Sequence, residues 1–248
     1  MGNIIKEIGI LVKSFVIIVE QKCNIMFEHR NTIAPEGYEE PDLPKLKRKN
    51  ENGHRVYYDQ DGNRYHSTTT VVGSIDEKGL NEWKARVGED VAKYVSIRAT
   101  TLGTKMHNMI ENYLGNEKNT ETSIFAKAHF NNIKPLLDKI QHINGLETKI
   151  CSKELGLAGT ADCIAEYDGI HSIIDFKTSS KLKKEEWIKK YFLQTTAYSL
   201  MWEELTSTKI DQIVILISGE DGSREEYIRQ RDDYVDELKE VVANYKEQ

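Results

Sequence analysis

The segment "DCIAEYDGIHSIIDFK", from Asp162 to Lys177, constrains the fold more than any other part of the chain. Two apolar runs flank Asp168-Gly169, and an Asp-Gly pair in that setting predicts a β-hairpin with a two-residue type I′ turn. In such a hairpin, residues at equal distances before and after the turn lie opposite each other. Asp162, six residues before Asp168, therefore lies opposite Asp175, six residues after Gly169. Because side chains alternate along a strand, we expect Asp162, Asp175 and Lys177 on one face of the sheet.

Two opposed carboxylates are stable only if something positive lies between them. Their Cβ atoms are about 4.5–5.5 Å apart, and their charges repel unless a cation separates them. Mg²⁺ and Mn²⁺ prefer carboxylate oxygens, and Lys177 could orient or help to deprotonate a water on the ion. The pattern therefore indicates metal-assisted hydrolysis of a phosphodiester.

The alternative is a solvent-facing hairpin with a surface pair of aspartates and a lysine partner. Against it, "SIIDFKT" is apolar on both sides of Asp175, which is typical of a buried central strand. The glycines of "GLAGTAD", from Gly156 to Asp162, also predict a close approach of the backbone to another group. We therefore favour the metal site.

The rest of the chain predicts a mixed sheet flanked by helices. Two β-branched and aromatic runs around Asp61-Gly62 predict a hairpin. Helical spacing of apolar residues begins near Leu80, and we expect a break near Thr100–Gly103 and a C-cap at Gly115. The further predicted elements are a helix over 123–143 kinked or broken at Pro135, strands over 146–155, 157–167 and 171–179, a helix over 185–205, strands over 210–218 and 225–230, and a helix over 232–245.

The fold class is therefore α/β (α+β), with a mixed central β-sheet flanked by helices and a helical N-terminal half. We expect residues 53–248 to form a single domain and residues 1–52 to form an N-terminal extension and linker, because the segment 31–52 is rich in Pro, Glu and Lys. The apolar run within residues 1–25 is about half as long as a bilayer requires. We therefore favour a helix packed on the domain, or an extension before a start at Met26, over a membrane anchor.

Charge and cysteine content limit the possible classes further. The 248 residues carry a net charge of −6, whereas proteins that bind nucleic acid are usually more basic. Cys23, Cys151 and Cys163 show no C-x-x-C spacing, so neither a zinc ribbon nor a redox motif is supported. So few cysteines fit a reducing compartment, and we expect the cytoplasm of a bacterium or of a virus-infected cell, with a mitochondrial location left open.

Four segments of the chain, in this order, resemble the PD-(D/E)XK nuclease superfamily. They are "GTKMH" at 103–107, "KELGLAGTAD" at 153–162, "IIDFKTSSK" at 173–181 and "QTTAY" at 194–198. The G-x-x-x-H pattern upstream and the Q-x-x-x-Y pattern downstream resemble the RecB-like branch, which includes mitochondrial genome maintenance and phage exonucleases. The resemblance covers about residues 101–199.

The resemblance implies a role for each matching residue. Asp162 and Asp175 resemble the acids that bind Mg²⁺ or Mn²⁺, Lys177 completes a catalytic D-x-K core, and His107 resembles a helical histidine of the metal shell. Residues implied to support the site or to contact substrate are Gln194, Tyr198 and Glu154. No iron–sulfur cluster is expected, because no cysteine follows Cys163. No P-loop pattern is present, so we expect no nucleotide cofactor.

Two basic clusters bear on the substrate. One is Lys45, Lys47, Arg48 and Lys49, and the other is Lys177, Lys181, Lys183, Lys184, Lys189 and Lys190, interleaved with Trp187, Tyr191 and Phe192. Most charge runs are solvated surface, but aromatic residues beside lysines suit stacking of unpaired bases, and Lys181 is placed to contact phosphate.

We therefore predict a monomeric, metal-dependent DNA exonuclease that acts on single-stranded DNA or DNA ends in replication, recombination or repair. Within the same class, the alternative is an endonuclease or flap nuclease. From other classes, the alternatives are a nuclease-like protein that binds nucleic acid without cutting it, and a protein tethered to a membrane by residues 1–25.

Overall fold

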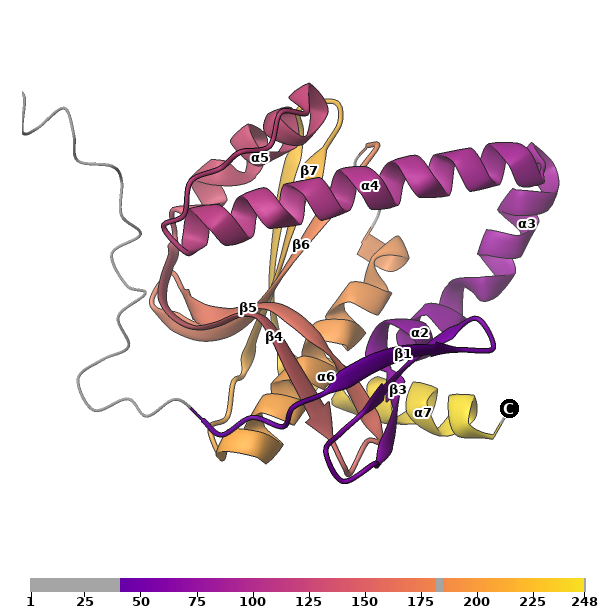
Figure 1. The fold of residues 1–248 in the computed structure, drawn as a ribbon, viewed down its shortest axis with the longest axis vertical. Helices are drawn as coiled ribbons and strands as arrows, with labels where there is room; N and C mark the ends of the chain where they lie inside the picture. The colour runs from indigo at the N-terminus through magenta and orange to yellow at the C-terminus, as the bar shows by residue number, and fades with distance from the viewer. Residues whose placement is uncertain (1–40, 182–184, 248) are drawn as a thin grey trace, which may run out of the picture.

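The computed structural model describes residues 41–181 and 185–247. Figure 1 shows a twisted sheet with helices on both of its faces. The described strands are β1 (Lys47–Glu51), β2 (His54–Tyr58), β3 (Arg64–Ser67), β4 (Ile140–Ser152), β5 (Leu157–Tyr167), β6 (Ile170–Ser179), β7 (Gln212–Gly219) and β8 (Arg224–Gln230). The described helices are α2 (Thr68–Gly73), α3 (Glu77–Val87), α4 (Glu89–Leu114), α5 (Ile124–Leu137), α6 (Lys189–Thr206) and α7 (Val235–Lys246), with short 3₁₀ turns at Ser74–Asp76, Glu185–Trp187 and Arg231–Tyr234.

The described strands form one mixed sheet. Its order is β1-β2-β3-β5-β6-β7-β8, with β4 paired to β5 outside this path. The pairs β3–β5 and β6–β7 are parallel and the other pairs are antiparallel. The predicted fold class, a mixed central sheet flanked by helices, is confirmed.

Alternate residues of the central strands supply a hydrophobic core on each face of the sheet. On β6, Ile173 belongs to the core that packs against α2, α6 and α7, whereas Ile174 and Phe176 belong to the core beneath α4 and α5. The neighbouring strand β7 divides in the same way, with Ile215 on the α6 side and Leu216 on the α4 side. Both faces of β6 and β7 are therefore buried, as the apolar run around Asp175 predicts.

The predicted hairpin at Asp168-Gly169 is confirmed. Asp168 and Gly169 have φ angles of 50° and 80°, as a type I′ turn requires, and Tyr167 faces Ile170. The ladder between β5 and β6 ends, however, at the pair Cys163↔Ile174. The expected ladder pair of Asp162 with Asp175 is therefore not formed, and the two strands separate one residue too early for it.

The reason for this separation lies in how β5 shares its edges. β4 pairs with β5 from Ile140↔Tyr167 to Ser152↔Leu157 and so occupies one edge of the strand along its length. The other edge is shared, because β3 pairs at residues 157–158 and β6 pairs at residues 163–167. Residues 159–162 thus have no ladder partner on that edge among the described strands. We call this opening, bounded by residues 159–162 of β5 and by β6 from Asp175 onward, the strand fork.

The boundaries of helix α4 differ from those that the sequence predicts. The expected break near Thr100–Gly103 is wrong, because α4 runs unbroken for 26 residues and the chain turns at Gly88, which has a φ of 86°. Packing explains the continuity, since apolar side chains of α4 on either side of Gly103 are buried against the sheet and outweigh its weak helix propensity. The predicted C-cap at Gly115 is confirmed, and Pro135 lies within α5 near the end of that helix.

The segment expected to be a linker contributes to the sheet. Residues 47–51 form the edge strand β1, and Leu46 is buried against Tyr57 and Tyr65. The predicted linker over residues 31–52 is therefore wrong for its last residues, whereas the predicted extension and apolar run at residues 1–25 lie outside the described part of the chain. No described helix is both long enough and apolar enough to span a lipid bilayer.

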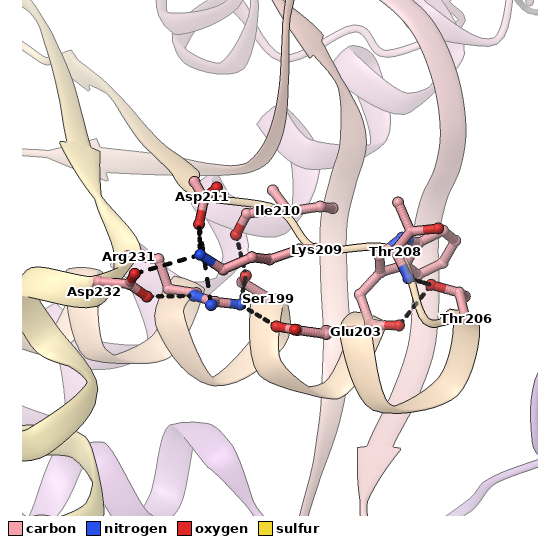
Figure 2. Close-up of polar contacts among 10 residues, drawn as sticks. Ser199, Glu203, Thr206, Thr208, Lys209, Ile210, Asp211, Arg231 and Asp232 are labelled. Carbon is pink, nitrogen blue, oxygen red and sulfur yellow. Dashed lines mark hydrogen bonds and ion pairs between the residues drawn. The ribbon is translucent and has the colours of Figure 1, made fainter.

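A buried arginine fixes the C-terminal half of α6 to the sheet (Figure 2). The side chain of Arg231 is 5 % exposed, and its guanidinium contacts Ser199 and Glu203 on α6. The same group donates to Asp232 at 3.1 Å and lies 4.0 Å from Asp211, just before β7. Since a buried cation with several acceptors holds its neighbours in one geometry, this network sets the position of the helix.

At Gly159 a side chain of α6 packs directly on the backbone of β5. A Cβ atom at this position would be 2.5 Å from Cε1 and 2.7 Å from the hydroxyl oxygen of Tyr198. Tyr198 is itself buried. The predicted close backbone approach in "GLAGTAD" is therefore confirmed, and the group that approaches is the Tyr198 ring.

This close approach predicts that Gly159→Ala lowers the free energy of unfolding by about 1–3 kcal/mol, as overpacking of a core does. Gly103→Ala is the matched control, because a Cβ there would meet only the Thr178 hydroxyl at 3.6 Å, and alanine should stabilise α4 by about 0.5–1 kcal/mol. Urea unfolding of both variants measures the difference. Equal effects of the two substitutions would show that Tyr198 does not restrict position 159.

Candidate active site

The carboxylate of Asp162 occupies the strand fork. Its Oδ2 atom accepts a hydrogen bond of 2.9 Å from the backbone N–H of Phe176 on β6. The side chain therefore bridges the two strands just beyond the end of their ladder, at the level where the Asp162–Asp175 pair was expected. A backbone donor stabilises the ionised form of a carboxylate and fixes its direction.

His107 reaches the same place from α4. Its Nε2 atom lies 2.8 Å from the carbonyl oxygen of Phe176, and its ring packs edge-on against the Phe176 ring. Because a carbonyl oxygen only accepts, Nε2 carries the proton and Nδ1 faces the acids. Nδ1 lies 3.6 Å from Asp162 Oδ2 and 3.8 Å from Glu147 Oε1.

His107, Glu147 and Asp162 form a cluster that could hold a cation. One ligand atom of each residue lies within 4.8 Å of the others. Two carboxylate oxygens and one imidazole nitrogen are suitable donors for Mn²⁺, and for Mg²⁺ to a lesser degree. The orientation of His107 fits such an ion, because the Phe176 carbonyl holds Nε2 and leaves Nδ1 directed toward the two acids.

The two acids also change the protonation of His107. Burial alone lowers the pKa of this imidazole, but the negative charge of Asp162 and the hydrogen bond to Glu147 outweigh it and raise the pKa to about 9. Without a cation, His107 therefore carries a proton on Nδ1 at neutral pH. A divalent cation at the same place would compete with that proton.

Asp175 and Lys177 lie side by side on β6, as the alternation of the strand predicts. Their side chains form an ion pair, and Asp175 is only 1 % exposed. The second oxygen of Asp175 accepts a 2.8 Å hydrogen bond from the side-chain amide of Gln194 on α6. Lys177 also lies over the Tyr191 ring, 5.1 Å from its centroid. Gln194 and Lys177 thus fix both oxygens of one buried carboxylate.

Burial and neighbouring charges shift both members of this pair. Burial raises the pKa of Asp175 to about 6, against the attraction of Lys177 and with a further contribution from the negative charge of Asp162. Burial alone would lower the pKa of Lys177, but Asp175 and Asp162 raise it above its usual value. Lys177 is therefore a cation at neutral pH, suited to holding an anion or orienting a water and unsuited to acting as a base.

Tyr198 lies behind this pair on the same helix as Gln194. It is buried against Gly159, and burial, reinforced by the charge of Asp175, raises the pKa of its hydroxyl well above the usual value. The structure thus brings Gln194 to Asp175 and places Tyr198 against the backbone of the strand fork. Both positions support the site, while contact of either residue with substrate stays a prediction.

Two predicted substrate-binding residues are not brought to the cluster. Glu154 is exposed in the turn between β4 and β5. Strand β5 begins only at Leu157, and the five residues from there to Asp162 span about 16 Å. Lys181 is exposed just after β6, and among the described residues its side chain has no contact with the cluster. The acid that does join Asp162 is Glu147 on β4.

Glu147 could have been found from the sequence by counting along the β4–β5 hairpin. Ser152 pairs with Leu157, so the same register places residue 147 opposite Asp162. Glu147 has a φ of 46°, which lies outside regular strand geometry and interrupts the ladder at this level. The sequence motif drew attention to Glu154 because it precedes the glycines, whereas the register selects Glu147.

Three of the four described lysines of the predicted basic cluster at 177–190 form ion pairs with acids, and Lys177 with Asp175 is one of them. Lys189 forms an ion pair of 3.0 Å with Glu237, and Lys190 one of 2.7 Å with Asp76. Lys183 and Lys184 lie outside the described residues. The charge near the site is therefore lower than the sequence alone indicates.

Residues 129–248 match the sequence model of the PD-(D/E)XK nuclease superfamily. This part of the chain is therefore similar to PD-(D/E)XK nucleases. The match includes Asp162, Asp175, Lys177 and Gln194, while His107 and the strands β1–β3 precede it. The resemblance expected from the four motifs is thus confirmed at the level of the superfamily.

Individual relatives carry a nuclease name. Mitochondrial genome maintenance exonuclease 1 from Homo sapiens is 27 % identical over 156 residues, which cover 58 % of this chain and 45 % of the relative. The protein of that name from Mus musculus is 32 % identical over 111 residues, covering 42 % and 32 % of the two chains. The chain thus spans less than half the length of these relatives. A solved structure from Eubacterium rectale, described as a candidate exonuclease, has a TM-score of 0.43 and 14 % identity, covering 58 % of this chain and 63 % of its own.

The cluster predicts that Mn²⁺ stabilises the protein. An ion at a hundredfold excess over its dissociation constant adds about 2.7 kcal/mol, which raises the Tm by roughly 5–10 °C in a domain of this size. Thermal unfolding with and without Mn²⁺ measures the shift. We expect Glu147→Gln and Asp162→Asn to lose most of it.

Glu154→Gln is the matched control, because it removes an exposed acid from the same hairpin. It should keep the full Mn²⁺ shift. Retention of the shift by Glu147→Gln, together with its loss in Glu154→Gln, would reverse our assignment of the acid.

The raised pKa of His107 predicts a pH dependence of stability in metal-free protein. A group with a folded-state pKa above its unfolded value of about 6.5 stabilises the fold fully below that value and loses its contribution as pH rises through the folded pKa, about 9. We expect a loss of about 3 kcal/mol from this residue between pH 6.5 and 9 in urea unfolding with a chelator. His107→Asn should lack this loss, and exposed His54→Asn should show it. The same slope in both variants would contradict the assignment.

Proposed function

We propose that the protein is a metal-dependent deoxyribonuclease that hydrolyses phosphodiester bonds as an exonuclease. The observation that carries the proposal is the meeting, at one strand fork, of the His107–Glu147–Asp162 cluster with the buried Asp175–Lys177 pair. The superfamily match over residues 129–248 and the exonuclease names of the relatives support the same reaction class.

Each group has a distinct task in this proposal. A Mg²⁺ or Mn²⁺ ion at the cluster supplies Lewis-acid activation of a water and of the phosphoryl oxygens. Lys177, kept cationic by Asp175 and Asp162, holds the attacking water in position and stabilises the negative charge that develops on the phosphoryl oxygens. Asp175 would be a further ligand of the ion through Oδ2, because Gln194 holds Oδ1.

In this proposal, Gln194 and Tyr198 hold other residues of the site in position. Gln194 fixes the direction of Asp175 through a 2.8 Å hydrogen bond, and Arg231 fixes the helix that carries Gln194. Tyr198 packs against Gly159 and keeps the strand fork open. Such buried supporting contacts hold reacting groups within the small tolerance that catalysis requires.

Single-stranded DNA or a DNA end is the proposed substrate. The proposal rests on the names of the relatives and on the aromatic residues near Lys177, of which Trp187 is 56 % exposed. The ion pairs of Lys189 and Lys190 remove part of the support that the sequence alone offers for this substrate. Action as a monomer in a reducing compartment belongs to the same proposal.

The test is a cleavage assay on end-labelled linear DNA, single-stranded and double-stranded, and on closed single-stranded circles, with Mg²⁺ or Mn²⁺. We expect digestion of linear single strands and persistence of the circles. Rapid cutting of circles would indicate an endonuclease, and no cutting of any DNA would favour a protein that only binds nucleic acid.

Substitutions at the buried pair test the residue assignments. Asp175→Asn and Lys177→Met should reduce cleavage by about 10²–10⁴-fold, the range for loss of a positioned acid–base or electrostatic group. Lys189→Met is the matched control, because this lysine pairs with Glu237 away from the fork, and it should retain activity. Full activity in Lys177→Met would remove Lys177 from the mechanism.

A further inference from the structure

A cavity beside the acidic cluster contains two cations for which the proposed reaction gives no role. Its volume is about 690 Å³, in the range of pockets that hold small ligands. His107 and Glu147 line the cavity, so it is continuous with the candidate active site. Arg48 from β1 and Lys149 from β4 line it as well, together with Asn108 of α4.

The strand register explains why Arg48 reaches this cavity. Arg48 pairs with Tyr57 on β2, and directly paired side chains of an antiparallel ladder lie on the same face. Tyr57 packs in a small core with Cys151 and Ala158, which lie on the same faces of β4 and β5 as Lys149 and Thr160, so Arg48 is on the side of the cavity. Its neighbour Lys49 lies on the other face, 4.8 Å from the centroid of the Tyr58 ring. Of the basic residues at 45–49, Arg48 is the one that lines the cavity.

The strand register also explains why Lys149 of β4 lines the cavity. It follows Glu147 by two residues and pairs with Thr160, which precedes Asp162 by two residues on β5. Thr160 also lines the cavity. Two residues of strand correspond to about 6–7 Å, so Lys149 lies one short step along the sheet from the acidic cluster.

Both cations lack a partner within the part of the chain that the structure describes. Neither Arg48 nor Lys149 forms an ion pair or a side-chain hydrogen bond there, and both are exposed. The other basic residues near the fork differ, because Lys177 pairs with Asp175 and Lys190 with Asp76. Two unpaired cations on the wall of a concave site attract an anion.

Both signs of charge line the cavity. Glu147 on β4 belongs to the acidic cluster, and Glu111 on α4 is a further acid. The cations Arg48 and Lys149 lie on β1 and β4. A phosphodiester strand matches this arrangement, because one phosphate can lie at a divalent ion while the next meets the cations.

We propose that Arg48 and Lys149 bind the backbone phosphate adjacent to the phosphate that is cleaved. The proposal rests on the proposed nuclease function and adds the residues that hold the strand beside the reacting group. Because phosphate contacts carry no base information, this binding is independent of sequence. Asn108 provides a neutral donor in the same cavity.

Binding to a labelled single-stranded oligonucleotide, measured with the full chain in Ca²⁺ at several salt concentrations, tests the proposal. Arg48→Ala and Lys149→Ala should each weaken binding about tenfold at low salt. Each should also reduce the slope of log K against log salt by about 0.7, the value for one phosphate contact with a single strand. Lys49→Ala removes one charge from the opposite face of β1 and should change neither quantity.

A substrate with a single neutral methylphosphonate linkage identifies the phosphate that is bound. When the linkage lies next to the cleavage position, Arg48→Ala should cause no further loss of affinity, because the charge it recognises is already absent. An unchanged penalty at every position of the linkage would overturn the proposal. A loss of inhibition by a nucleoside monophosphate in both variants, with strand binding intact, would assign the cavity to the product and would also overturn it.

The outcomes separate this proposal from the proposed function. If the chain cuts DNA with Mn²⁺ while Arg48→Ala and Lys149→Ala behave like Lys49→Ala, the phosphate site is wrong and the nuclease stands. If the two variants weaken binding as expected but no DNA is cut with Mg²⁺ or Mn²⁺, the phosphate site stands and the nuclease function is wrong. A chain that neither binds nor cuts DNA contradicts both.

Discussion

The shared edge of β5 is the constraint on which the rest of the site depends. β3 and β6 both pair with this edge, and neither covers residues 159–162. Backbone groups left without a ladder partner in a buried sheet must find other partners. The N–H of Phe176 finds the carboxylate of Asp162, and its carbonyl oxygen finds His107. The opening of the sheet thus positions two candidate metal ligands through main-chain hydrogen bonds.

A second constraint is the buried charge beside this opening. Moving a carboxylate and an ammonium group out of water costs more than their attraction returns unless other groups complete the geometry. Asp175 and Lys177 meet this condition in part, through Gln194 and the Tyr191 ring, yet the pKa of Asp175 still rises to about 6. Such a pair adds little to stability, and its position beside the acidic cluster supports the chemical role that we propose for it.

The sequence predicts the local parts of this arrangement well. The Asp-Gly turn, the succession of helices and strands along the chain from β5 onward, and the placement of Asp175 and Lys177 on one face follow from propensity and alternation, which depend on neighbouring residues. The separation of the strands before Asp162 does not follow, because it depends on β3, about 90 residues earlier in the chain. The continuity of α4 through Gly103 likewise depends on packing against the sheet. The position of Glu147 is an intermediate case. Counting the register from the β4–β5 turn would have placed it opposite Asp162, whereas the sequence motif pointed to another acid.

The central claim is that His107, Glu147 and Asp162 hold a divalent cation at the strand fork. Anomalous diffraction from crystals of the protein soaked in Mn²⁺ tests it most directly, because the signal locates the ion independently of activity. We predict a peak between Nδ1 of His107 and the carboxylates of Glu147 and Asp162, at about 2.0–2.3 Å from its ligands. An ion bound elsewhere, with these three side chains outside its coordination sphere, would contradict the account.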